Sequence, residues 1–219
     1  GSLARFDRDQ YTWKSDSSQL LRTGQLRWGS NLFHGGILFL FFGHLFGQLT
    51  PHALYGLLLT SSQKQLVAVV AGGVAGTACF IGLSMLLHRR LSDPRIRLTS
   101  HRTDIAILVI LWVQLALGLS TLPSSLHHVA EPTTMLRLAS YLQGIATLNP
   151  DASLVSGVEW HFQVHMVLGM TIFLLFPFSR LVHVWSGFAS VGYILRPYQL
   201  VRARRLNLPS GHNTPRRVL

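Results

Sequence analysis

The chain has 219 residues, of which 48% are hydrophobic and 12% are charged, against roughly 25% charged residues in soluble domains. The low charge excludes an ordinary soluble core and favours a bundle of membrane helices. The single cysteine, Cys79, excludes a disulfide framework and any iron–sulfur or structural zinc site built on cysteines. The formal net charge is +11, and the positions of the charges explain it without nucleic acid binding.

Residues 1–30 are polar and basic, and they lack the apolar segment of a secretory signal peptide. We expect them to form a lead-in on the cytoplasmic side. Four nearly uncharged segments follow, each close to the roughly 20 residues that carry a helix across about 30 Å of hydrocarbon. They cover residues 32–49, 66–87, 105–122 and 158–184. The predicted fold class is all-α, a transmembrane bundle of four helices within residues 31–187.

The second half of the chain carries further local signals. The third helix is predicted to end near Pro123, and a long outer loop follows, with an amphipathic helix expected over residues 135–145. The fourth helix contains Pro177, which is expected to kink it. Residues 188–219 are predicted to form a basic tail on the cytoplasmic side.

The basic residues gather on one side of the predicted bundle. All of the 19 lysines and arginines except Lys64 and Arg137 fall before the first span, between the second and third spans, or at the end of the fourth span and beyond. Cytoplasmic loops of membrane proteins carry such an excess of positive charge. Both termini and the loop after the second span are therefore expected in the cytoplasm.

Four histidines lie in the apolar segments, His34 and His44 in the first and His165 and His183 in the last. Imidazole is costly to bury in hydrocarbon without partners, so intramembrane histidines suggest a functional site. Neutral imidazole is a standard axial ligand of haem iron, and no cysteine thiolate accompanies these positions. The pattern predicts two b haems stacked across the membrane, and hence transmembrane electron transfer. The alternative is that each histidine is a hydrogen-bonded core residue.

The topology decides which histidines pair. The first and fourth spans run antiparallel, so His34 is expected to face His183 near the cytoplasm, and His44 to face His165 near the outer surface. Ten residues of helix rise about 15 Å and eighteen rise about 27 Å, so tilt, the Pro177 kink or oblique haems must absorb the difference. Two histidines fill both axial positions of a haem iron, which favours electron relay over catalysis at the iron.

Two further residues on the outer side are candidates. The ammonium of Lys64 can hydrogen-bond the oxygen of a quinol headgroup at the membrane rim; the alternative is a lysine that only extends to the interface. His161 lies one helical turn before His165 and competes with it as the outer ligand. Its position beside Glu159 and Trp160 favours a role at the solvated rim.

Several long motifs point to one family. A close resemblance to the gamma subunit of respiratory membrane-bound nitrate reductase is carried by QYTWKSDSSQLL, SNLFHGGILFLFFGHLFGQLTPH, HMVLGMTIFLLFPFSRLVHVWS and YQLVRAR, and it extends over residues 5–205. The resemblance implies a multi-pass dihaem cytochrome b in the bacterial cytoplasmic membrane. Such subunits oxidise quinol near the outer face. They pass electrons to an iron–sulfur beta subunit and a molybdenum alpha subunit, where nitrate is reduced.

The resemblance also assigns residues to these roles. It implies inner-haem ligands at His34 and His183, outer-haem ligands at His44 and His165, and a quinol site at Lys64 and Gly43. His161 is not part of the family's pattern. The family has a further span before the QYTW segment, so four of its five spans are expected in this chain.

Two other functions stay open from the sequence. The same haems can serve the membrane subunit of a formate dehydrogenase or hydrogenase type of complex, with another iron–sulfur partner. The chain can also be a haem-free membrane anchor whose histidines relay protons. A visible spectrum separates the last class from the first two, because only a haem protein gives a b-type spectrum.

Overall fold

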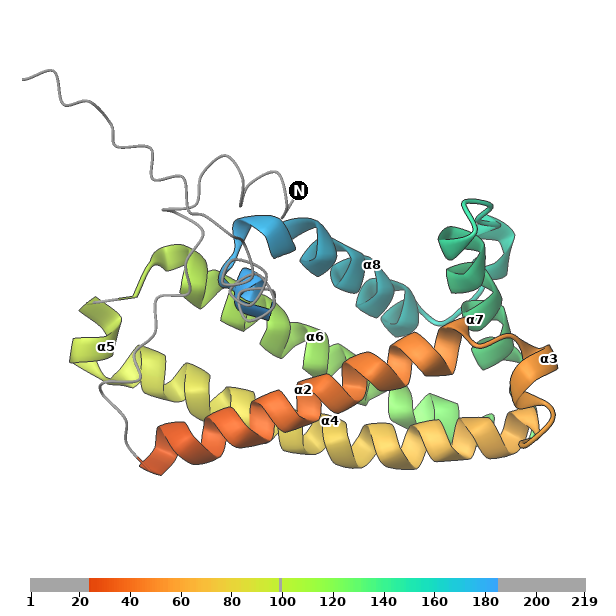
Figure 1. The fold of residues 1–219 in the computed structure, drawn as a ribbon, viewed down its shortest axis with the longest axis horizontal. Helices are drawn as coiled ribbons and strands as arrows, with labels where there is room; N and C mark the ends of the chain where they lie inside the picture. Colours follow the sequence, from red (N-terminus) through yellow and green to blue (C-terminus); the bar gives the residue numbers. More distant parts are fainter. Residues whose placement is uncertain (1–23, 99, 185–219) are drawn as a thin grey trace, which may run out of the picture. The chain divides into compact units, whose positions relative to one another are not determined.

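The computed structural model describes residues 24–98 and 100–184 (Figure 1). The chain divides into two compact units, Gly1–His183 and Val184–Leu219, and every helix described below belongs to the first. Most of the predicted lead-in and all of the predicted basic tail, residues 188–219, lie outside the described residues.

Four long helices dominate the described part of the chain. They are α2 (Gly24–Leu49), α4 (Ser61–Ser92), α6 (Arg102–His127) and α8 (Trp160–Leu175). Each is long and apolar enough to cross a membrane, α8 together with the turn that follows it. Helices suit this setting because they satisfy every backbone polar group within one segment. The predicted fold class, an all-α transmembrane bundle with four spans, is confirmed.

Short elements connect the long helices. They are α3 (His52–Tyr55), α5 (Pro94–Leu98), α7 (Thr133–Ala146) and the 3₁₀ turns η2 (Ala152–Leu154), η3 (Phe176–Phe178) and η4 (Arg180–Val182). Helix α7 is the amphipathic helix expected in the outer loop. Elements α3 and α7 lie at one end of the bundle, and α5 lies at the other end (Figure 1).

Two helix boundaries differ from the prediction. The first helix begins at Gly24, within the predicted lead-in. Helix α6 continues through Pro123 and ends at His127, not near the proline. Proline removes one backbone donor and crowds the preceding turn, and this position lies close to the helix end, where few intrahelical bonds remain to be lost.

The fourth span was expected over residues 158–184 with a kink at Pro177, and the structure has a break in the helix there instead. Helix α8 stops at Leu175, and Pro177 lies in η3. Ser179 then adopts an extended backbone, and its hydroxyl accepts a hydrogen bond from the amide of Leu181 at the start of η4. Proline cannot continue the hydrogen-bonding pattern of a helix, so the chain changes direction here. His183 therefore follows η4 and is not a residue of α8.

The long helices pack in chain order, α2 on α4, α4 on α6 and α6 on α8. Small residues allow the closest approach, which is between α2 and α4: a Cβ placed on Gly36 would lie 2.6 Å from the Cβ of Cys79. Membrane helices commonly pack through such small residues. The buried core lies along this contact and along α6, and it comprises Phe33, Cys79, Leu83, Ile107, Leu111 and Leu115.

Large apolar side chains cover the outside of the bundle. Phe39, Phe46, Val70 and Val74 are examples, each more than half exposed. A water-soluble monomer rarely exposes a continuous apolar surface of this extent. A surrounding lipid phase accounts for it.

Candidate functional site

The structure brings the four intramembrane histidines together as two pairs. The rings of His34 and His183 have centroids 6.1 Å apart and lie 75° from parallel. The rings of His44 and His165 have centroids 6.3 Å apart and lie 42° from parallel. These are the two pairs that the antiparallel topology predicts.

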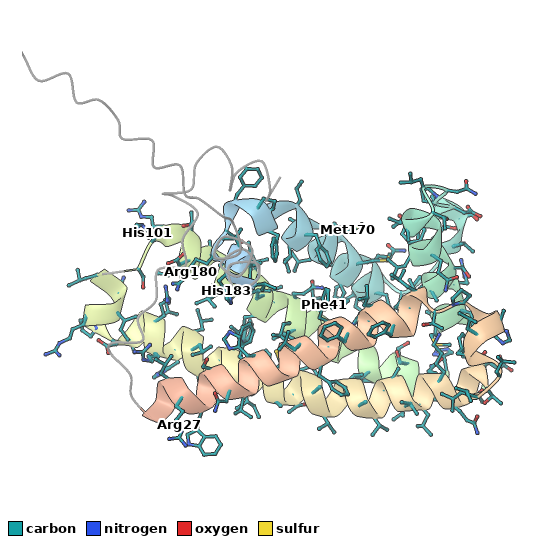
Figure 2. The ribbon with its side chains drawn as sticks, viewed as in Figure 1. Arg27, Phe41, His101, Met170, Arg180 and His183 are labelled. Carbon is teal, nitrogen blue, oxygen red and sulfur yellow. The ribbon has the colours of Figure 1, made fainter. Side chains whose placement is uncertain are left out.

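The two pairs lie at different levels of the bundle. His34 and His44 are ten residues apart on the single helix α2, a rise of about 15 Å. On the other side, His165 lies in α8, whereas His183 is reached through the break at Pro177. A continuous helix would carry His183 about 27 Å along its axis from His165, whereas the broken segment places its ring 6.1 Å from that of His34. Figure 2 shows His183 at the end of the turned segment, next to Arg180.

Each of the four rings presents Nδ1 to a backbone carbonyl oxygen. The acceptors are Ser30 for His34 at 2.8 Å, Leu40 for His44 at 2.8 Å, Gln114 for His165 at 3.1 Å and Arg180 for His183 at 2.7 Å. A carbonyl can only accept, so Nδ1 carries the proton in each neutral ring and Nε2 holds the lone pair. A second hydrogen bond of this kind commonly orients metal-binding histidines. All four rings therefore have the tautomer suited to metal binding through Nε2.

The spacing of the pairs suits a metal held between two rings. An imidazole nitrogen lies about 2 Å from a metal it binds, so two rings on opposite sides of one metal have centroids about 6 Å apart once the ring radii are added. Both pairs have this separation. No group of three or more His, Cys, Asp or Glu side chains that could hold a metal ion occurs in the described part of the chain. Haem needs only the two axial ligands, because its macrocycle supplies the others.

The surroundings of the pairs leave room for a flat group. Helices α2 and α8 do not pack closely on each other in the described structure, although their histidine rings meet. Gly35 and Gly43 stand next to His34 and His44, and no atom beyond the local helix lies within 4 Å of a Cβ placed on either glycine. The donor set, its spacing and these glycines fit two haem groups.

Lys64 lies in the first turn of α4, at the end of the bundle that holds α3 and α7. Its Nζ is 3.6 Å from the centroid of the Tyr55 ring, a cation–π contact. The Tyr55 hydroxyl is 3.2 Å from the hydroxyl of Ser61. Lys64 does not touch Gly43, because no side chain lies within 4 Å of the Cβ position of that glycine. The sequence did not single out Tyr55; a tyrosine in the short connection before the lysine was the available signal.

His161 contacts other residues than the four paired histidines do. Its Nε2 is 3.2 Å from a carboxylate oxygen of Glu159, and its ring packs against those of Trp160 and Phe162. The side chain is 14% exposed, and a role at the solvated rim stays a prediction.

A buried carboxylate lies at the opposite end of the bundle. Asp104 of α6 is 6% exposed, and its Oδ2 is 3.3 Å from Nη1 of Arg90 and 3.2 Å from Nη1 of Arg180. The carbonyl of Arg180 accepts the Nδ1 hydrogen bond of His183. The network therefore connects α4 and α6 to the turn that presents His183 to His34. Sequence reasoning did not find this role for Asp104.

The comparison with known proteins decides the family. The family model described as the nitrate reductase gamma subunit matches residues 1–204. The chain belongs to the nitrate reductase gamma subunit family. It is 51% identical over 207 residues to the respiratory nitrate reductase 2 gamma chain of Escherichia coli strain K12, covering 94% of this chain and 90% of that relative. It is 37% identical to the nitrate reductase gamma chain of Bacillus subtilis strain 168, covering 93% and 91%.

Membership in the nitrate reductase gamma subunit family fixes the general role of the chain. It is the membrane subunit of a nitrate reductase, an oxidoreductase of several subunits. The four apolar helices agree with a membrane location. The resemblance stated from the sequence motifs is confirmed.

Proposed function

We propose that this gamma subunit is a dihaem cytochrome b that oxidises quinol near the outer face of the bacterial cytoplasmic membrane. Its electrons go to an iron–sulfur beta subunit and a molybdenum alpha subunit that reduces nitrate. The observation that carries the proposal is the pairing of His34 with His183 and of His44 with His165, each with Nε2 as the lone-pair nitrogen. Nitrate reduction itself belongs to another subunit.

The two pairs have the same chemical task. His34 and His183 would hold the inner haem, and His44 and His165 the outer haem, each through Nε2. A bound haem supplies a centre that accepts and returns one electron at a time. Held by two imidazoles, such a haem would have no position free for oxygen or substrate, which suits electron relay. The protein around each pair holds the rings in place through the hydrogen bond at each Nδ1.

Lys64 is proposed to bind the quinol, with Gly43 lining the approach to the outer pair. Its ammonium can donate a hydrogen bond to a quinol oxygen, and the Tyr55 ring beneath it stabilises the positive charge. Oxidation of quinol releases its two protons along with its electrons. At the outer end of the bundle these protons leave to the outside.

The orientation rests on the basic residues. Among the residues that the structure describes, the α5 end of the bundle carries Arg95 and Arg97, whereas the end with α3 and α7 carries only Lys64 and Arg137. The excess of positive charge favours the α5 end in the cytoplasm. On this basis both termini of the chain are cytoplasmic.

Family membership favours nitrate reductase over a formate dehydrogenase or hydrogenase type of complex. A haem-free anchor with proton-relaying histidines is distinguished by experiment. The complex is purified with its partner subunits, and the gamma subunit is followed by its visible spectrum. We expect a quinol analogue to reduce b-type haem and nitrate to reoxidise it. Purified complex without a b-type spectrum would support the anchor, and haem that quinol reduces but nitrate does not reoxidise would support another complex.

A further inference from the structure

One histidine of the outer pair is held differently from the other three. His34, His44 and His183 direct Nδ1 to a carbonyl three or four residues earlier in their own segment. His165 of α8 instead directs Nδ1 to the backbone carbonyl of Gln114 on α6, at 3.1 Å. A helix that carries no histidine of either pair therefore sets the orientation of this ring.

The side chain of Gln114 makes a second contact with the His165 residue. Its Nε2 donates to the backbone carbonyl of His165 at 3.0 Å and lies 3.5 Å from Nε2 of the imidazole. A Cβ on Gly169, one helical turn along α8, would lie 3.1 Å from this amide nitrogen. The glycine thus gives the amide room to reach the backbone of α8.

Gly118 makes the matching space on α6. It lies one helical turn after Gln114, and a Cβ at this position would be 2.9 Å from Cε1 and 3.5 Å from Nδ1 of His165. A separation below 3.0 Å forces the ring to shift. The imidazole therefore packs against bare backbone, and the lack of a side chain keeps the Gln114 carbonyl within reach of Nδ1.

We propose that Gln114, Gly118 and Gly169 form a seat that positions His165 as a ligand of the outer haem. The proposal rests on the proposed function. The hydrogen bond at Nδ1 fixes the tautomer and the ring plane and raises the basicity of Nε2, so it tunes both the affinity for iron and the redox potential. The three residues are positioning residues, since they act through the imidazole.

The test replaces Gly118 by alanine in the intact nitrate reductase complex. The added methyl group pushes the ring away from the Gln114 carbonyl. We expect the low-spin electron paramagnetic resonance signal and the midpoint potential of one haem to shift, or that haem to be lost. The other haem keeps its signal and potential. Gly72→Ala is the matched control, because this glycine of α4 has no atom beyond its local helix within 4 Å of a Cβ.

A second variant covers the case in which Gly118→Ala does not accumulate in the membrane. Gln114→Leu removes the amide but keeps a side chain of similar length, and we expect the same single haem to shift. The comparison requires a wild-type complex that contains two haems. The seat is refuted if the variant that accumulates keeps both haems with the signals and midpoint potentials of the wild type. A wild-type complex without haem would instead refute the proposed function, and the seat with it.

Discussion

The ring of His34 lies 6.1 Å from the ring of His183, although the first belongs to a straight membrane helix and the second follows the break after α8. The pairing of His34 with His183 therefore depends on the turn that contains Pro177. The other pair, His44 and His165, meets directly between two helices.

We predict that alanine variants of the four paired histidines fall into two groups, according to which haem each variant loses. His34→Ala and His183→Ala should remove the same haem, and His44→Ala and His165→Ala the other, because each haem loses an axial ligand. Potentiometric titration of the b-type absorption in purified complex identifies which haem remains. His161→Ala is the matched control and should keep both, since its imidazole contacts Glu159. Loss of a haem in this variant would contradict the assignment of His165.

The sequence was sufficient for the bundle and for the partners within each pair. Uncharged length predicts the spans, and the antiparallel order of the first and last spans follows from their number. The sequence could not predict that helix α8 would end at Leu175, because one proline is compatible with either a kink or a stop. The actual stop also depends on Ser179 and its bond to the amide of Leu181.

The sequence also could not predict which side chains make contacts between helices. Gln114 is a polar residue in an apolar span, which is a signal of function, but nothing in its neighbourhood along the chain points to His165. The same holds for Asp104 and Arg180, which meet only because the turn after α8 comes back to α6.

Asp104→Asn should destabilise the subunit. It removes the carboxylate shared by Arg90 and Arg180 and leaves their charges without this partner. Breaking a buried ion pair costs about 3 kcal/mol, which lowers the unfolding temperature by about 6–12 °C in a chain of this size. Thermal unfolding in detergent measures the change. Glu131→Gln, at an exposed carboxylate in the loop between α6 and α7, should leave the temperature within a degree or two of wild type. An equal fall in both variants would count against the network.

The orientation can be tested with introduced cysteines. A membrane-impermeant thiol reagent added to intact cells should label Ser153→Cys and not Ser92→Cys, because the α5 end is expected in the cytoplasm. The native Cys79 is fully buried and should not react. Disrupted cells, where both positions are accessible, are the control for reactivity. The reverse labelling pattern would exchange the inner and outer haem assignments.

Lys64→Ala should slow quinol oxidation and leave both haems in place. A hydrogen bond contributes about 0.5–1.5 kcal/mol net, so haem reduction by a quinol analogue is expected to slow by about two- to tenfold. Stopped-flow absorption measures this rate. Lys64→Arg keeps the charge over Tyr55 and should retain more of the rate than alanine does. Wild-type rates together with unchanged inhibitor binding in Lys64→Ala would make this lysine an ordinary interfacial residue.

The haem content of the purified wild-type complex is the most direct test of the dihaem assignment. The reduced-minus-oxidised spectrum is recorded, and extracted haem b is divided by the amount of gamma subunit. We expect a low-spin b-type spectrum with about two haems per chain, one for each histidine pair. A ratio near zero would contradict the assignment, and a ratio near one in fully folded complex would mean that one of the two histidine pairs holds no haem.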